Sequence, residues 1–284
     1  MRLRLFHAPD GARVAYREAG TGPPLALLHS LLLSHRELAP VVEHLTDRFR
    51  VVLPDLPAHG DSEDRPRHPY TLEWLTEVMA AFCRDVCGPR PLVGGHGAGA
   101  ELLLRATATQ QLRPSRLVLM PSRMHRVTKA TALERRWRLA ARLGGVPGLD
   151  RGAAHAAHRL VSPSLGPRLT ASGSAAAGDL VRHAYADVAG NPNLVRSWAR
   201  LARRWPRAAQ RDLLDAYAKI DVPVLLLWAD ADREHPLEAA EEALDLFPRA
   251  QLRVLPGTGF LMAYDDPVGL AREIKAFCGQ PGVP

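Results

Sequence analysis

The chain has 284 residues, of which 46% are hydrophobic and 24% charged, as in a folded globular protein with a sizeable core. Its formal net charge is +7, and almost all of the positive charge is arginine. The arginines are spread along the chain among acidic residues, so the pattern does not indicate a nucleic-acid partner. No run of about 18 apolar residues is present, so no membrane span or membrane partner is expected.

Three cysteines, Cys83, Cys87 and Cys278, have a spacing that fits neither a disulfide framework nor a metal site. They are expected to be small buried hydrophobes in a reducing compartment. The first seven residues alternate like a strand and lack the apolar block of a signal peptide. We therefore expect a cytoplasmic protein without metal or other cofactor.

The hydrophobic pattern predicts strands that alternate with helices. The strands are expected at residues 2–7, 12–19, 25–28, 51–53, 91–94, 117–120, 224–228 and 251–255. The helices are expected at residues 34–48, 71–87, 98–110, 237–247 and 267–278. Such alternation predicts an α/β protein with a mostly parallel central sheet and helices on both faces.

Residues 123–215 interrupt this alternation. They are rich in Ala, Arg and Gly and are broken at 144–148, 162–167 and 191–193, which predicts several helices joined by loops. We interpret this segment as a helical cap inserted into a core domain made of residues 1–122 and 216–284.

The run from Leu92 to Ala100 predicts a buried strand, a turn of small residues and a helix. In the nucleophile elbow, G-x-S-x-G, this arrangement raises a serine hydroxyl above the sheet. Gly95 and Gly99 match the outer glycines, but the central residue is Gly97. The turn is thus built for a nucleophile that the sequence does not supply.

Five stretches, in the expected order, resemble the α/β-hydrolase superfamily over almost the whole chain. They resemble its oxyanion loop, its P-D-x-x-G-x-G-x-S loop, its elbow, its acid segment and its histidine segment, and they are Leu27–Ser30, Pro54–Ser62, Gly95–Gly99, Trp228–Asp232 and Leu255–Phe260. The resemblance implies an α/β-hydrolase fold in which Asp232 is the catalytic acid. It also places Gly97 at the nucleophile and Phe260 at the histidine.

Glycine offers no nucleophile and phenylalanine cannot carry a proton, so serine hydrolysis is not expected. The candidate catalytic groups are Asp232, whose pKa burial would raise, Ser30 as a hydrogen-bond donor, and Ser122 with a base at His125. His235, just before a helix, is expected to be a surface residue.

A hollow site is expected to remain between cap and core. Backbone N–H groups at the elbow and at the His29 loop would still converge there. We expect the cavity to be bounded by Ser30, Leu31, Gly97, Ala98, Ser122, Asp232 and Phe260. Further substrate-binding candidates are His29, His96, His125, Trp137, Tyr185 and Trp198.

These features favour an enzyme that cyclises an apolar, polyketide-like intermediate in bacterial secondary metabolism, by cycloaddition, Michael-type closure or elimination. One alternative is an inactive binder or partner protein. Another is a hydrolase or lyase that uses Asp232 and improvised residues. The protein is expected to be a monomer or homodimer.

Overall fold

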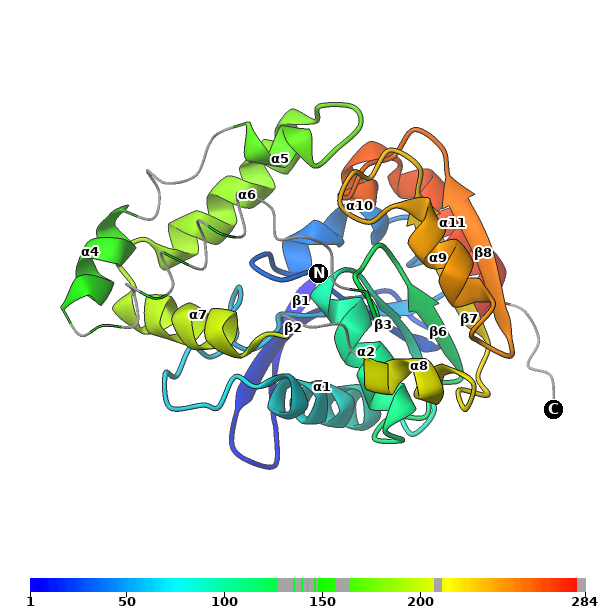
Figure 1. Cartoon of the computed structure of the whole chain (residues 1–284), viewed down its shortest axis with the longest axis horizontal. Coiled ribbons are helices and arrows are strands. Elements are labelled where there is room, and N and C mark those ends of the chain that lie inside the picture. The colour runs from blue at the N-terminus through cyan, green and yellow to red at the C-terminus, as the bar shows by residue number, and fades with distance from the viewer. Residues whose placement is uncertain are drawn as a thin grey trace.

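The structure is a computed structural model in which segments far apart in sequence come together around one sheet (Figure 1). It describes residues 1–126, 148–156, 164–206 and 211–279, together with the single positions 135, 139, 142 and 146.

The eight strands form a single sheet in the order β1-β2-β4-β3-β5-β6-β7-β8. In chain order they are β1 (Arg2–His7), β2 (Arg13–Ala19), β3 (Pro24–Leu28), β4 (Arg50–Pro54), β5 (Leu92–Gly95), β6 (Arg116–Leu119), β7 (Val224–Ala229) and β8 (Ala250–Leu255). The β1–β2 and β2–β4 pairs are antiparallel, and the remaining pairs are parallel. The predicted strands and the mostly parallel sheet are confirmed.

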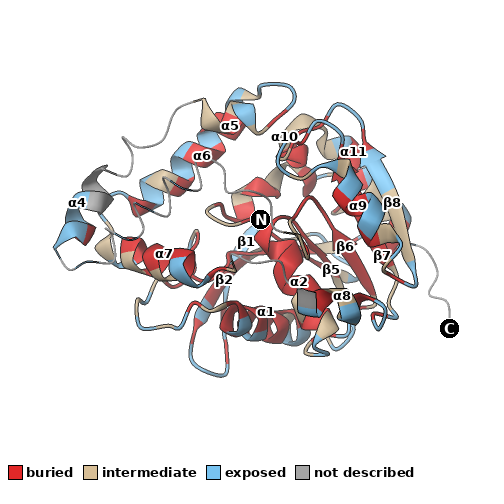
Figure 2. Ribbon diagram, viewed as in Figure 1, coloured by how far each residue is buried: buried red, intermediate tan, exposed pale blue. Residues whose placement is uncertain are grey.

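Helices cover both faces of this sheet. The described helices are α1 (Leu72–Cys87), α2 (Ala98–Ala108), α4 (Leu149–Ala156), α5 (Leu165–Arg168), α6 (Ala175–Val188), α7 (Pro192–Arg204), α8 (Arg211–Tyr217), α9 (Leu237–Leu244), α10 (Met262–Asp265) and α11 (Pro267–Cys278). One apolar cluster packs α1, α2 and α9 against one face, and a second packs α11 against the other. Figure 2 shows the central strands buried between them, whereas the edge strand β8 is largely exposed or half-buried.

The single helix predicted at residues 34–48 is wrong. The structure has two short 3-10 turns there, η1 (His35–Glu37) and η2 (Ala39–Val41). Pro40 lies inside the predicted helix and has no N–H to donate. The carboxylate of Asp55 also accepts a hydrogen bond from the backbone N–H of His35 at 2.7 Å, which ties η1 to the loop after β4.

The strand order changes direction between β3 and β5, and this places two loops side by side. From β3 the chain moves to β4 on one side, then crosses to β5 on the other side. Leu28 and Gly95 are paired at the carboxyl ends of these strands. Ligands of open α/β sheets bind in the crevice at such a switch point. The loop of Ser30 and the turn of Gly97 begin here.

The regular elements that the structure describes between β6 and β7 are all helices, joined by turns and loops. We call α4 to α7 the cap (Figure 1). The buried side of α6 packs with Leu33 and Leu261, whereas α7 joins the larger core cluster through Leu194 and Trp198. α8 packs against α2. None of the described helices is both long and apolar enough to cross a membrane.

Phe82 of α1 is central to the larger core, since its ring makes edge contacts with Phe6 and Tyr16 of the antiparallel strands. We expect Phe82→Ala to lower the free energy of unfolding by about 3–5 kcal/mol, because it leaves a cavity in a closely packed region. Chemical denaturation measures this. The exposed Val268→Ala is the matched control, and an equal loss in both variants would contradict the assignment of Phe82 to the core.

Candidate active site

The elbow between β5 and α2 keeps its shape without a nucleophile. Gly97 is the N-cap of α2, with φ 51° and ψ −118°. Its N–H donates to the carbonyl of Pro121 at 2.9 Å, which joins the turn to the end of β6. A positive φ is costly for residues with a side chain but not for glycine. The turn can therefore keep a backbone conformation that would be strained for a residue with a side chain.

Ser30 occupies the space into which a side chain at position 97 would point. A Cβ built on Gly97 would lie 2.7 Å from the Cβ of Ser30 and 3.6 Å from the ring of Phe260. The first distance is far below van der Waals contact. Ser30 therefore fits against the elbow in its present position because residue 97 carries no side chain.

A buried network fixes Ser30. Glu37 accepts three hydrogen bonds: from the backbone N–H of Ser30 at 2.6 Å, from its hydroxyl at 2.8 Å and from Nδ1 of His96 at 2.6 Å. Burial alone would raise the pKa of Glu37, but the charge and hydrogen bond of His96 outweigh burial and lower it. Because the hydroxyl of Ser30 already donates its hydrogen bond to Glu37, Ser30 is not the free hydrogen-bond donor that the sequence suggested.

Asp232 has a histidine partner that the resemblance did not place. Nδ1 of His235 lies 2.9 Å from Oδ2 of Asp232, and the backbone N–H groups of Glu234 and His235 donate to Oδ1. Burial alone would raise the pKa of Asp232, but these contacts outweigh burial and lower it. The predicted raised pKa is therefore wrong. The expectation that His235 is a surface residue is also wrong, because its side chain is only 10% exposed.

His235 lies beside the position that the resemblance assigns to a histidine. Its ring stacks on the ring of Phe260, with the two centroids 5.1 Å apart. The ring of His96 also contacts Phe260, with the centroids 4.2 Å apart. The imidazole thus reaches Asp232 from the loop after β7, not from the loop after β8. No hydrogen bond of Nε2 is found among the described residues. That atom is free to act on a ligand.

A cavity of about 230 Å³ opens in front of these groups. Most of its described walls come from the Ser30 loop, the elbow, α5, α6 and the loop after β7. The described lining residues are Ser30, Leu31, Leu32, Leu33, Gly97, Ala98, Glu101, Arg123, Leu165, Leu169, Val181, Tyr185, Trp205, Glu234, His235 and Phe260. The lining is mostly apolar, as is usual for small-molecule sites. Two of the expected boundary residues, Ser122 and Asp232, are not part of this wall.

Two residues that line the cavity have a backbone N–H without an acceptor among the described residues. In the α/β-hydrolase elbow, the oxyanion hole uses the N–H after the nucleophile and an N–H from the loop after β3. Here these belong to Ala98 and Leu31, which both line the cavity. Within the described residues neither N–H donates a hydrogen bond. The site can therefore stabilise negative charge on a ligand oxygen.

Glu101 is a second titratable group in the wall, and the sequence analysis missed it. It lies four residues after Gly97 on α2, hence on the same helix face. Burial raises its pKa to about 7, although the nearby Arg123 acts in the opposite direction. A carboxyl group with this pKa exchanges protons near neutral pH.

The other predicted site residues do not reach the cavity. His29 is fully buried, with Nε2 accepting from the N–H of Leu56 at 2.9 Å. Ser122 is buried, and its hydroxyl has no hydrogen-bond partner among the described residues, so it is not paired with His125. His125 contacts Tyr217 instead.

Of the predicted aromatic roof, Tyr185 lines the cavity. Trp198 lies behind it, donating Nε1–H to the carbonyl of Ala58 at 2.7 Å. Trp137 falls outside the described residues.

One described cluster has the atoms of a metal site: His35, Asp55 and Asp61. The guanidinium of Arg17 already lies among them, 3.1 Å from Nδ1 of His35 and 2.6 Å from Asp61. This side-chain cation supplies the positive charge, so the cluster is explained as an ion-pair network.

Comparisons with known proteins match most of the chain to one family. The profile of the alpha/beta hydrolase family matches residues 25–273. The chain is 28% identical to the magnesium-chelatase 30 kDa subunit of Rhodobacter capsulatus, over 83% of this chain and 80% of that protein. It is 25% identical to an uncharacterized protein of Mycobacterium tuberculosis, over 96% and 80% respectively.

Solved structures agree in fold. An alpha/beta hydrolase fold protein from Burkholderia ambifaria is 26% identical, with a TM-score of 0.76 and coverage of 98% and 97% of the two chains. A thermophilic esterase from Thermogutta terrifontis is 22% identical, with a TM-score of 0.76 and full coverage of both chains.

Gly97→Ser tests the fit between the elbow and Ser30. We expect a loss of about 1–3 kcal/mol in the free energy of unfolding, because the new Cβ meets Ser30 and takes a positive φ. The loss should be smaller by about 1 kcal/mol or more when Ser30→Gly is already present. Denaturation of the two single variants and the double variant measures this coupling, and strict additivity would contradict it.

Glu101→Gln tests the buried carboxyl. The pKa of Glu101 is about 7 in the folded chain against 4.5 for the free group, so the folded state holds the proton more tightly. As the pH rises from 4.5 to 7, stability falls, and this pKa difference corresponds to about 3 kcal/mol. The variant should lack that fall. Denaturation across this pH range measures it, and the exposed Glu241→Gln is the control. A fall of equal size in Glu101→Gln and wild type would refute the assignment.

Proposed function

Since the chain belongs to the alpha/beta hydrolase family but has glycine at the nucleophile position, we propose that it is an acid–base enzyme without a covalent intermediate. It closes a ring in, or eliminates a group from, a small apolar substrate that contains a carbonyl group, such as a polyketide-like molecule. One observation carries this proposal: His235 lines a mostly apolar cavity, and Asp232, which lies outside the cavity wall, is hydrogen-bonded to its Nδ1.

The proposed reaction begins with the transfer of a proton to His235. The carboxylate of Asp232 accepts the hydrogen bond from Nδ1, so the lone pair of the neutral imidazole is at Nε2. Nε2 removes a proton from the carbon next to the substrate carbonyl. A positioned base of this kind contributes about 10²- to 10⁴-fold to a rate.

The charge that develops on the carbonyl oxygen is accommodated by the N–H groups of Leu31 and Ala98. The resulting enolate attacks an electrophilic carbon of the same molecule, or expels a leaving group. The apolar walls hold the substrate folded, which brings the reacting carbons together before the reaction. The imidazolium of His235 then returns its proton to the cyclised product or to the leaving group, which restores the base. Glu101, with a pKa of about 7, is a second group in the wall that exchanges protons near neutral pH.

A surrogate reaction tests the base before the natural substrate is known. 5-Nitrobenzisoxazole is small and apolar, and it opens to a phenolate once a base removes its ring proton. We expect the protein to accelerate this opening, and His235→Gln to lower the rate by about 100-fold or more. Asp232→Asn should lower it less, because the imidazole remains but loses its orienting acceptor.

The matched control is His183→Gln, which removes an exposed histidine of α6. Absorbance of the phenolate follows the reaction. A rate that is unchanged in His235→Gln would refute the proposed base. With a natural linear substrate, a product of unchanged mass would indicate ring closure. A gain of one water would instead indicate that the pair activates water for hydrolysis.

A second candidate function is that of a binding or partner protein without catalysis. The similarity to a protein named as a magnesium-chelatase subunit over 83% of this chain favours it. Such a protein would use the same cavity to hold a ligand. It would bind apolar molecules there but show no rate with 5-nitrobenzisoxazole that depends on His235.

A further inference from the structure

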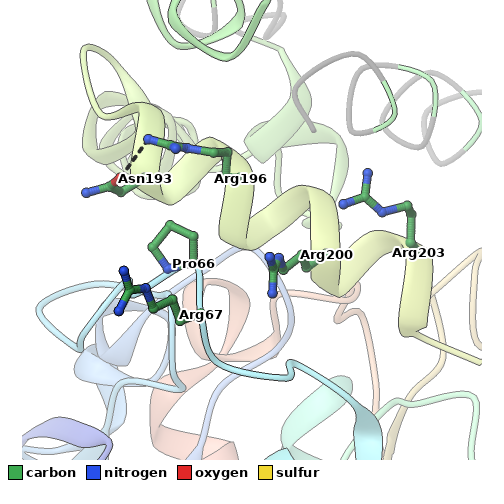
Figure 3. A pocket seen from close by; sticks show the side chains of 6 residues that line it. All are labelled: Pro66, Arg67, Asn193, Arg196, Arg200 and Arg203. Carbon is green, nitrogen blue, oxygen red and sulfur yellow. Dashed lines mark hydrogen bonds between the residues drawn. The ribbon is translucent and has the colours of Figure 1, made fainter. Parts of the chain in front are cut away.

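A second cavity, of about 400 Å³, lies between α7 and the loop after β4. It shares no lining residue with the candidate active site. Its walls are Pro66, Arg67, Asn193, Arg196, Arg200 and Arg203. Figure 3 shows the three α7 arginines along the helix, with Arg200 directed into the space between the helix and the loop. The described lining residues of this hollow therefore include four guanidinium groups and no carboxylate.

The arginines are held in place by the opposite side of α7. Leu194, Trp198 and Leu201 are buried in the core cluster, so the helix is fixed against the sheet domain. Arg196, Arg200 and Arg203 recur at intervals of four and three residues, which places them on one face of the helix. Arg67 adds a fourth positive charge from a separate loop.

Within the part of the chain that the structure describes, three of the four guanidinium groups have no ion-pair partner. Arg196 contacts Asp150 at 3.1 Å and Asn193 at 2.8 Å. For Arg67, Arg200 and Arg203, no hydrogen bond or ion pair exists within the described structure. Some arginines elsewhere are paired with a carboxylate, such as Arg17 with Asp61 and Arg50 with Glu18.

This arrangement has an electrostatic cost. Like charges at helix positions three and four apart repel each other, and α7 contains no acidic residue to offset them. A solvated helix face would lower this cost by mixing both signs of charge. A bound anion lowers it directly.

We propose that this cavity binds a phosphate-bearing small molecule with at least two phosphate groups, such as a nucleoside diphosphate. Guanidinium groups bind phosphate oxygens in pairs, and several of them suit an oligophosphate. A volume of about 400 Å³ is in the range of small-molecule sites. The hollow shape favours such a ligand over an acidic protein, which would need a broad surface.

Isothermal titration with inorganic pyrophosphate and with ADP tests the proposal at physiological ionic strength. We expect both to bind, and Arg200→Gln and Arg203→Gln each to weaken binding by about tenfold or more. Arg200→Lys should also weaken binding, because an ammonium group cannot form the paired contact. The matched control is Arg272→Gln, an exposed arginine of α11, which should leave binding unchanged.

Circular dichroism confirms that each variant is folded. The proposal is overturned if neither pyrophosphate nor ADP binds at millimolar concentration. It is also overturned if Arg272→Gln weakens binding as much as Arg200→Gln. Binding to phosphatidylglycerol vesicles without binding to pyrophosphate would indicate a membrane surface instead, and equal binding of poly-aspartate would indicate an acidic protein partner.

Discussion

The close approach of Ser30 to Gly97 is the constraint on which the site depends. No side chain fits at position 97 while the Cβ of Ser30 lies 2.7 Å from where its Cβ would stand. Ser30 cannot easily retreat, because Glu37 holds both its backbone N–H and its hydroxyl, and His96 holds Glu37 from the elbow itself. The missing nucleophile is thus part of a packed arrangement that involves two strands of the switch point.

The carboxylate of Asp232 is paired with a histidine that follows it by three residues, not with a residue at position 260. Asp232 orients His235 three residues away, and Phe260 stacks on the imidazole where the resemblance would place a histidine. An imidazole that is hydrogen-bonded to a carboxylate therefore lines the same apolar cavity as two backbone N–H groups that lack an acceptor among the described residues. These groups lack a nucleophile. The set is therefore better suited to proton transfer at carbon than to acyl transfer.

The sequence predicted the fold well and the site only in part. The strands alternate clearly with helices, so their positions and the elbow at Gly97 could be read from local patterns. The cavity walls at Ser30, Leu31, Ala98, Tyr185 and Phe260 were also predicted. Glu37, His235 and the arginine cavity were not, because each depends on contacts between loops or helices that no local pattern specifies. The spacing of Asp232 and His235 was the one available signal.

The most direct test of the account is the ¹⁵N NMR spectrum of the His235 imidazole, recorded with and without 2-naphthol as an apolar enol mimic. If His235 is the base, its Nδ1–H is hydrogen-bonded and this bond is lost in Asp232→Asn, and its Nε2 resonance shifts when 2-naphthol binds. An imidazole that responds neither to the loss of Asp232 nor to the ligand would contradict the assignment of His235 as the base of this site.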